Sequence, residues 1–313
     1  MLTLLEFVAR HARWCLILGL LAGLFLPGLA VLLRPWLPHM VALMLFMTAL
    51  RIGPRDAVQS LSALGRTAGA ALVLQLLLPL VAVALLGFIG LPAGPLAVAV
   101  VLMLAAPSIT GSPNFTVMAG HDPAPALRLL VIGTALVPLT VVPVFLALPA
   151  LGGTDQLLGA VGRLLGVILG ATAVAFALRH VAIPRLGRRA VNALDGAGAI
   201  TLGLMVVALM SAIMPALARD PVALAGWLAA AFAVNFGFQL ATFALLRASG
   251  RRANAVPLAI IAGNRNIALF LVALPPETTG PLLIFIGCYQ FPMYLTPLLL
   301  ARLYRAGHGH QAM

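Results

Sequence analysis

Long apolar runs, separated by short clusters of arginine, proline and glycine, dominate the chain. A helix needs about 20 residues to cross the hydrocarbon core of a bilayer, and the runs are close to that length. The first run, residues 15–33, exceeds the apolar core of a signal peptide and lacks a small-residue cleavage site, so we interpret it as a helix. The pattern predicts ten transmembrane helices, near residues 14–34, 38–53, 66–91, 95–119, 123–148, 156–179, 194–217, 222–247, 255–274 and 279–304.

The composition agrees with this pattern. Hydrophobic residues make up 63% of the chain and charged residues 8%, whereas about a quarter of a soluble domain is charged. No polar stretch is long enough for a separate soluble domain, so residues 1–313 are expected to form a single all-α membrane domain. The sequence holds no phosphate-binding loop, HExxH, GxSxG or paired-carboxylate motif, and its two cysteines lie inside apolar runs. We therefore expect neither an enzyme nor a bound cofactor.

The net charge of +12 would suggest a nucleic-acid partner in a soluble protein. Here we interpret the basic residues as topology signals, because all of them are arginine and most flank the apolar runs. The absence of lysine is typical of a GC-rich bacterial genome. Two arginines, Arg34 and Arg219, fall in loops of one side, and fourteen fall on the other: Arg10, Arg13, Arg51, Arg55, Arg66, Arg179, Arg185, Arg188, Arg189, Arg247, Arg251, Arg252, Arg302 and Arg305. The positive-inside rule then predicts a protein of the bacterial inner membrane with both termini in the cytoplasm. We expect membrane lipids around the helices and no nucleic-acid partner.

The two halves of the chain share a motif. Gly111-Ser112-Pro113-Asn114 in the fourth predicted helix and Gly263-Asn264-Arg265-Asn266 in the ninth both read G-x-x-N, 152 residues apart. Residues 1–149 and 156–304 thus form two repeats of five helices. Because five is odd, the second repeat enters the membrane from the opposite face, which gives the inverted repeat found in many secondary transporters.

Both motif helices are predicted to break near the middle of the membrane. Pro107, Gly111 and Pro113 fall within seven residues of the fourth helix, and the ninth contains Pro257 and Gly263. Broken backbone at membrane depth is tolerated only where protein buries it or it lines a cavity. We therefore expect helices four and nine to be discontinuous, with breaks at Gly111–Asn114 and Gly263–Asn266, and to cross. Two kinked helices joined by interhelical hydrogen bonds remain an alternative.

Motifs along nearly the whole chain resemble those of the bile acid:sodium symporter family. They are HMVALMLFMTALRIGPRDA in the second helix, Leu74-Gln75-Leu76 with Pro79 in the third, APSITGSPNFTVMAGHD in and after the fourth, Thr134 and Pro138 in the fifth, and GNRNIALF in the ninth. The resemblance implies a ten-helix fold with interleaved panel and core subdomains. It also implies that helices four and nine cross in the core, and that organic anions move by alternating access.

The chain departs from the family where sodium binds. The resemblance implies two sodium ions held by a serine–asparagine pair, a glutamate, a glutamine and hydroxyls of the fifth helix. Here Asn114 is retained, but the glutamate and glutamine positions hold Ile261 and Arg265, and the hydroxyl positions hold Ala126 and Leu130. These degenerate sites have lost their carboxylate, so we expect no metal site and regard sodium coupling as doubtful.

An arginine inside a transmembrane segment is costly and by default functional, and guanidinium groups suit carboxylate or sulfonate ligands. We expect Arg265, with Arg128, to supply the positive charge that sodium supplies in the family. The alternative is that Arg265 pairs with helix ends or carbonyls and is structural. The predicted substrate-binding residues are Arg265, Asn266, Asn264, Asn114, Ser112, Thr110, Arg128 and Gln75.

The expected function is secondary active or facilitative transport of a small organic anion, with proton coupling as one option. The alternatives are a sodium-coupled symporter with a rearranged site, a relative of arsenite permeases or auxin carriers, a membrane enzyme, and a membrane sensor that does not transport. Two further expectations concern side chains: Asn235 and Gln239, one turn apart, face the core, and Asp195 pairs with Arg163 or an arginine at the interface.

Overall fold

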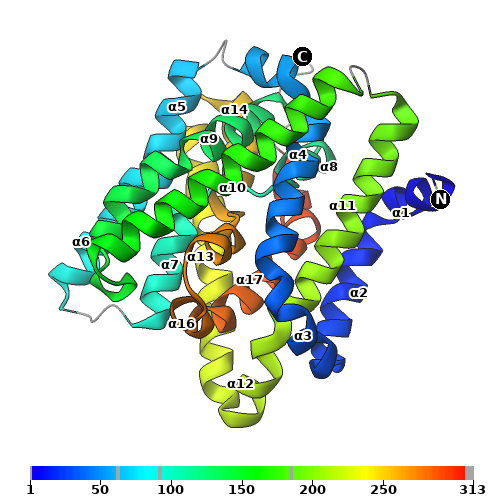
Figure 1. Ribbon diagram of the computed structural model, residues 1–313. Helices are drawn as coiled ribbons and strands as arrows, with labels where there is room; N and C mark the ends of the chain where they lie inside the picture. The colour runs from blue at the N-terminus through cyan, green and yellow to red at the C-terminus, as the bar shows by residue number, and fades with distance from the viewer. Residues whose placement is uncertain (1, 61–63, 91–93, 184–185, 307–313) are drawn as a thin grey trace. The chain divides into compact units, whose positions relative to one another are not determined.

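The computed structural model describes residues 2–60, 64–90, 94–183 and 186–306, and these residues are almost entirely helical (Figure 1). Arg185 and the side chain of Arg13, both predicted to be cytoplasmic, lie outside this description. Within the described residues, seven helices are long and apolar enough to cross a membrane: Pro27–Arg55, Leu64–Phe88, Ala124–Leu146, Thr154–Val181, Arg188–Arg219, Pro221–Ala248 and Pro276–Leu299. This is the architecture of an all-α, multi-pass membrane protein.

Six of these helices coincide with predicted helices, and the N-terminal region is more broken than predicted. The first helix, α1 (Leu2–Arg10), bends by 82° from the following helix. The apolar run predicted at 14–34 divides at Leu26 into α2 (Ala12–Phe25) and α3 (Pro27–Leu33), because Pro27 starts a new helix. After η1 (Arg34–Trp36), α4 (Leu37–Ser60) has non-helical backbone at Gly53, where the second predicted helix ends.

The fourth and ninth predicted helices are each divided, as expected. The fourth consists of α7 (Pro95–Ala105) and α8 (Ser112–Met118), so its break covers residues 106–111 and not Gly111–Asn114 as predicted. Pro113 belongs to the first turn of α8, where its missing N–H costs no hydrogen bond, and Ser112 and Asn114 are therefore helical. The ninth consists of α14 (Arg252–Gly263), η6 (Ile267–Leu269) and α15 (Phe270–Ala273), with its break at residues 264–266 as predicted.

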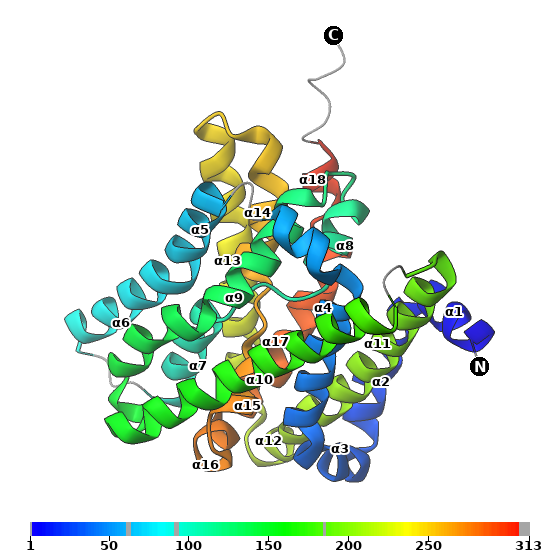
Figure 2. The ribbon, with the colours of Figure 1, turned by 45° about the horizontal axis from the view of Figure 1, so that its top comes forward.

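The chain divides into two compact units, and each takes segments from both halves of the sequence. Unit 1 comprises Met1–Ser62, Pro149–Ala225 and Ala268–Gly287, and unit 2 comprises Ala63–Leu148, Gly226–Ile267 and Cys288–Met313. In unit 1, α10 (Thr154–Val181) packs across α4, and α11 (Arg188–Leu209) packs against α1, α2 and α3 (Figures 1 and 2). Unit 1 also contains η4 (Pro149–Leu151), η5 (Met210–Ala212), α12 (Ile213–Arg219), α16 (Pro276–Thr279) and η7 (Gly280–Leu282).

Unit 2 carries the broken helices α7, α8 and α14. Around them pack α5 (Leu64–Leu72), the π-helical turn η3 (Val73–Leu77), α6 (Leu78–Phe88), α9 (Ala124–Leu146) and most of α13 (Pro221–Ala248). The unit ends with α17 (Leu283–Leu299), which starts in unit 1, and α18 (Ala301–Ala306). An apolar cluster around Ala259, Leu300 and Tyr304 packs residues of α13, α14 and α18 against one another.

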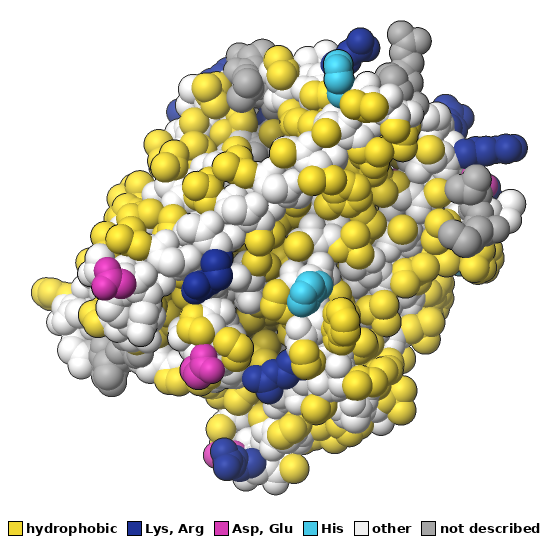
Figure 3. Space-filling model, viewed as in Figure 1, with side chains coloured by type: hydrophobic (Ala, Val, Ile, Leu, Met, Phe, Trp, Pro, Cys, Tyr) yellow, Lys and Arg dark blue, Asp and Glu magenta, His cyan; other side chains and the backbone are white. Residues whose placement is uncertain are grey.

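Large apolar side chains are exposed on many helices, as expected where lipid is the solvent. Phe88 is 89% exposed, Val222 82% and Val181 81%. On the face shown in Figure 3, hydrophobic side chains predominate and charged side chains are few. A surface of this kind would be unfavourable in water but loses nothing against hydrocarbon.

The polar interactions of unit 1 agree with the sequence analysis in one case and refine it in another. Asp195 on α11 forms an ion pair with Arg51 on α4, with Oδ1 2.6 Å from Nε, so its partner is an arginine at the predicted interface. Arg163 on α10 is exposed, and its Nε donates to the carbonyl of Ala273 over 2.9 Å. It therefore reaches the end of α15 and does not pair with Asp195.

The contact of α2 with α11 depends on glycine. A Cβ atom placed on Gly19 would lie 2.5 Å from the carbonyl oxygen of Gly203, which real contacts do not allow. We expect Gly19→Leu to lower the melting temperature by about 3–6 °C, because overpacking typically costs about 1–3 kcal/mol. Thermal unfolding of the purified protein in detergent measures the shift. Gly162→Leu on α10 is the control, because a Cβ there meets nothing within 4 Å; equal melting temperatures for the two variants would contradict the prediction.

Candidate functional site

The two breaks meet and pair with each other within unit 2, at a place that we call the crossing. Ser108 and Arg265 form an isolated antiparallel bridge between the extended segments. The N–H of Ile109 donates to the carbonyl of Asn264 over 3.2 Å, and the N–H of Asn266 donates to the carbonyl of Pro107 over 2.8 Å. These bonds replace the helical hydrogen bonds that the breaks remove, which explains how extended backbone persists inside an apolar unit.

Arg265 is buried at this crossing and held by backbone carbonyls. Its side chain is among the largest that are fully buried, with the residue 1% exposed. Nε donates to Ala262 O over 3.2 Å, one Nη to Ala106 O over 3.2 Å and the other to Leu74 O over 3.4 Å. These three bonds use three of the five N–H groups of the guanidinium.

The charge of Arg265 has no carboxylate to balance it in unit 2. The sequence segments of this unit contain eight arginines and a single acid, Asp122. Asp122 is exposed, and its Oδ1 accepts from the N–H of Ala124 over 2.9 Å, so it caps the first turn of α9. The carbonyls satisfy hydrogen bonds of Arg265 but carry no net charge, so the crossing keeps a desolvated positive charge.

A tyrosine of α17 secures the backbone on both sides of this arginine. The hydroxyl of Tyr289 donates to the carbonyl of Gly263 and accepts from the N–H of Arg265, the second over 3.0 Å. Tyr289 is fully buried. Its hydroxyl therefore acts as a bridge across the first turn of the break, where helical bonding has stopped.

A network of buried amides joins the crossing to α13 and α18. Asn235 Nδ2 donates to Gly263 O over 2.7 Å and to Asn264 Oδ1 over 3.2 Å. Gln239 Nε2 donates to Asn235 Oδ1 over 2.6 Å, and the hydroxyl of Tyr304 donates to Gln239 Oε1 over 2.9 Å. Asn235 and Gln239 thus face the core of the unit, as their spacing predicted.

Of the predicted site residues on helix four, only Ser112 joins the buried structure. Ser112 is fully buried, and its hydroxyl accepts from Ser108 Oγ over 2.8 Å. Thr110 is half-buried in the break, and Asn114 is exposed on α8. The structure therefore brings Ser112, Asn264 and Arg265 together but leaves Asn114 outside the hydrogen-bonded cluster.

The remaining predicted residues differ in how closely they approach the arginine. Gln75 is 1% exposed in the π-helical turn η3, directly after Leu74, and its Oε1 has no hydrogen-bond partner among the described residues. Asn266 is half-buried and joins the crossing through its backbone N–H. Arg128 is half-buried on α9 and takes no part in the bonds that hold Arg265.

The positions predicted as lost sodium ligands are apolar and packed. Ile261 and Ala126 are fully buried, and they belong to one cluster with Ala71, Leu129 and Ala262. Leu130 is 4% exposed on the same helix as Ala126. Side chains that pack in this way offer no oxygen to a cation, so a cation ligand set built on these positions is absent from the described residues.

The sequence analysis missed part of the network. Thr296 on α17 accepts from Gln239 Nε2 over 2.9 Å and donates to Pro292 O over 2.9 Å. Tyr304 also lay outside the predicted site, and its carbonyl accepts from His121 Nε2 over 3.1 Å. Thr296 lies 57 residues from Gln239, so no local pattern pointed to it. The available signal was a polar side chain inside the last apolar helix.

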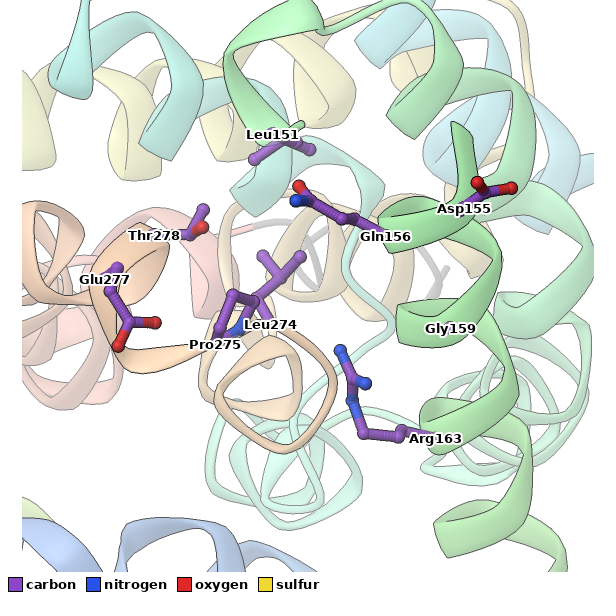
Figure 4. Close-up of a pocket in the computed structure, with 9 residues that line it drawn as sticks. All are labelled: Leu151, Asp155, Gln156, Gly159, Arg163, Leu274, Pro275, Glu277 and Thr278. Atoms are coloured by element: carbon purple, nitrogen blue, oxygen red, sulfur yellow. The ribbon is translucent and has the colours of Figure 1, made fainter. Parts of the chain in front are cut away.

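A cavity of about 510 Å³ lies within unit 1, between the start of α10 and the turn that precedes α16 (Figure 4). Its charged side chains are Asp155, Arg163 and Glu277, all exposed. Charges of both signs at an exposed mouth favour hydration over selective capture of an anion, so this cavity is a weaker candidate than the crossing.

Comparison of the sequence with models of known protein families and with curated proteins gave no match.

Proposed function

We propose that the chain is a secondary active or facilitative transporter that moves a small organic anion across a bacterial inner membrane. The observation that carries the proposal is Arg265: a desolvated guanidinium at the crossing of two broken helices, in a unit whose single acid is exposed and remote in sequence. An unbalanced buried cation attracts an anionic ligand, and an arginine at membrane depth is by default functional.

The broken helices support transport over a static role. In membrane transporters, discontinuous helices at an inverted-repeat interface form the binding site. We propose that α7 and α8 together form the fourth of ten membrane spans, and that α14 and α15 together form the ninth, in a five-plus-five inverted repeat. The division of the chain supports this, because both units contain segments of both repeats. The resemblance to the bile acid:sodium symporter family, carried by the motifs around Gln75, Asn114 and Arg265, points to the same architecture.

Alternating access explains why Arg265 is occluded here. An anion reaches a guanidinium that is 1% exposed only when the crossing opens. Ser112, Asn264, Asn266 and Gln75 lie at or beside the crossing and are proposed to bind the substrate with it. The unpartnered Oε1 of Gln75 would accept a hydrogen bond from a protonated group or a hydroxyl of the substrate.

We expect transport to be independent of sodium, because apolar side chains fill the predicted ligand positions and a fixed cation occupies the crossing. Thermal unfolding with a panel of monocarboxylates, dicarboxylates and sulfonates, in choline buffer, identifies a binding anion. Uptake of that radiolabelled anion into proteoliposomes is then measured with sodium or choline outside. We expect the uptake rates in the two salts to differ by less than about twofold. Sodium coupling of about 1.4 kcal/mol would already change uptake about tenfold.

The outcomes separate the alternatives. Uptake that requires sodium would contradict the proposed mechanism and select a symporter with a rearranged site. Binding without uptake would select a sensor. Uptake that follows an imposed pH gradient in the absence of sodium would identify the driving force as proton coupling.

A further inference from the structure

The three carbonyls around Arg265 are all released by interruptions of helical hydrogen bonding. Ala106 directly follows the last residue of α7, and Ala262 lies in the last turn of α14. Leu74 lies in the π-helical turn η3, where the spacing of backbone bonds changes. Carbonyls of this kind keep a lone pair that needs a donor or a cation.

These carbonyls have the chemistry of a cation site. Two helices, α7 and α14, end at the crossing, and the carbonyl end of a helix carries a partial negative charge. In secondary transporters, unwound carbonyls and the C-terminal ends of half-helices coordinate the coupling cation. Here all three oxygens accept from one guanidinium, over 3.2–3.4 Å.

We infer that Arg265 is the resident cation of this carbonyl site, covalently fixed in the place that an exchangeable monovalent cation would take. The side chain ties η3, α7 and α14 together through its positive charge. The native protein therefore binds no exchangeable cation at the crossing, and removal of the guanidinium opens a site for one.

The inference concerns the same crossing as the proposed function. It rests on the proposed function in one respect only: that transport needs no sodium at this site follows only if the protein is a transporter. Its test is a binding and stability measurement in detergent, without transport. A failure of the anion-uptake experiment therefore leaves the outcome below unchanged, and the two failures can be distinguished.

The test is the thermal unfolding of purified full-length wild-type protein and Arg265→Ala in detergent. Each is measured in choline chloride and, at equal ionic strength, with millimolar guanidinium or with sodium chloride. We expect the wild-type melting temperature to be the same in all salts. Arg265→Ala should melt at least about 5 °C lower in choline and regain at least half of that loss with guanidinium, the cation that fits the vacated space.

Arg163→Ala is the matched control, because Arg163 also donates to a backbone carbonyl but is exposed. Its removal widens an exposed cavity and leaves no buried group of released carbonyls, so its melting temperature should not respond to guanidinium. Recovery of both variants to the same extent would overturn the inference, as would an Arg265→Ala protein that melts like the wild type or that no cation restores.

Two further measurements keep the inference open to refutation if Arg265→Ala does not fold. Wild-type protein stabilised by sodium relative to choline would overturn it, because the site would then accept an exchangeable cation. Arg265→Lys keeps the charge but lacks the planar fork that reaches three carbonyls. We expect Arg265→Lys to fold and to gain no stability from guanidinium. In choline its melting temperature should lie below that of the wild type and above that of Arg265→Gln, a variant that leaves the site unfilled.

Discussion

Replacing Gly263 with alanine is expected to destabilise the protein by about 2–3 kcal/mol, a fall in melting temperature of roughly 4–6 °C. A Cβ atom at this position would lie 2.2 Å from the carbonyl oxygen of Asn235 and 2.4 Å from Gln239 Cγ. The first of these atoms belongs to the backbone of α13 and has no rotamer by which to move away. The added methyl group would therefore separate α13 from α14 at the point where the amide network reaches the crossing.

Gly111→Ala is the matched control, because Gly111 holds the same place in the other G-x-x-N motif. A Cβ there would meet only the side chains of Ile109 and Phe115, both at 3.9 Å, and its φ of −79° suits any residue. We expect its melting temperature to stay within about 2 °C of the wild type. Comparable losses for the two variants would show that the motif glycines serve backbone flexibility in both repeats, and that close packing at Gly263 is not the cause.

The pair also shows why the motif alone was ambiguous. Both glycines occur in the same four-residue pattern, yet a Cβ at one would clash with α13 and a Cβ at the other would make only ordinary van der Waals contacts. The difference arises from a helix contact more than twenty residues away, which a local motif cannot encode. The position of the break in helix four was ambiguous for a similar reason. Proline and glycine predicted that the helix breaks, but a proline can lie within a break, as Pro107 does, or in the first turn of the next helix, as Pro113 does.

The side-chain chemistry of the crossing was largely readable from the sequence, and its backbone chemistry was not. A single arginine in an apolar run, and two amides one turn apart at Asn235 and Gln239, are unusual enough to predict burial. The partners of Arg265 are carbonyls, which every residue carries, so nothing in Leu74, Ala106 or Ala262 marks them in advance. They are defined only by where helical bonding stops.

The second large effect is expected at Gln239, which connects α13 to both α17 and α18. Its amide donates to Asn235 and Thr296 and accepts from the hydroxyl of Tyr304. Gln239→Leu fits the space approximately but leaves the Tyr304 hydroxyl and the Asn235 oxygen buried without their partner. Each such group costs about 1–3 kcal/mol, so we expect a loss of about 2–6 kcal/mol in the free energy of unfolding, measured by thermal or denaturant unfolding in detergent.

Tyr304→Phe separates the contribution of the α18 bond from the rest of the network. It removes one donor and leaves Gln239 Oε1 unsatisfied, so its expected cost is about 1–2 kcal/mol. The double variant Gln239→Leu with Tyr304→Phe should lose less than the sum of the single losses, because the hydroxyl that Gln239→Leu leaves unpaired is then absent. Strictly additive losses would mean that Tyr304 and Gln239 do not share a hydrogen bond in the folded protein. The side chain of Tyr304 would then be held by its apolar contacts with Phe243 and its neighbours.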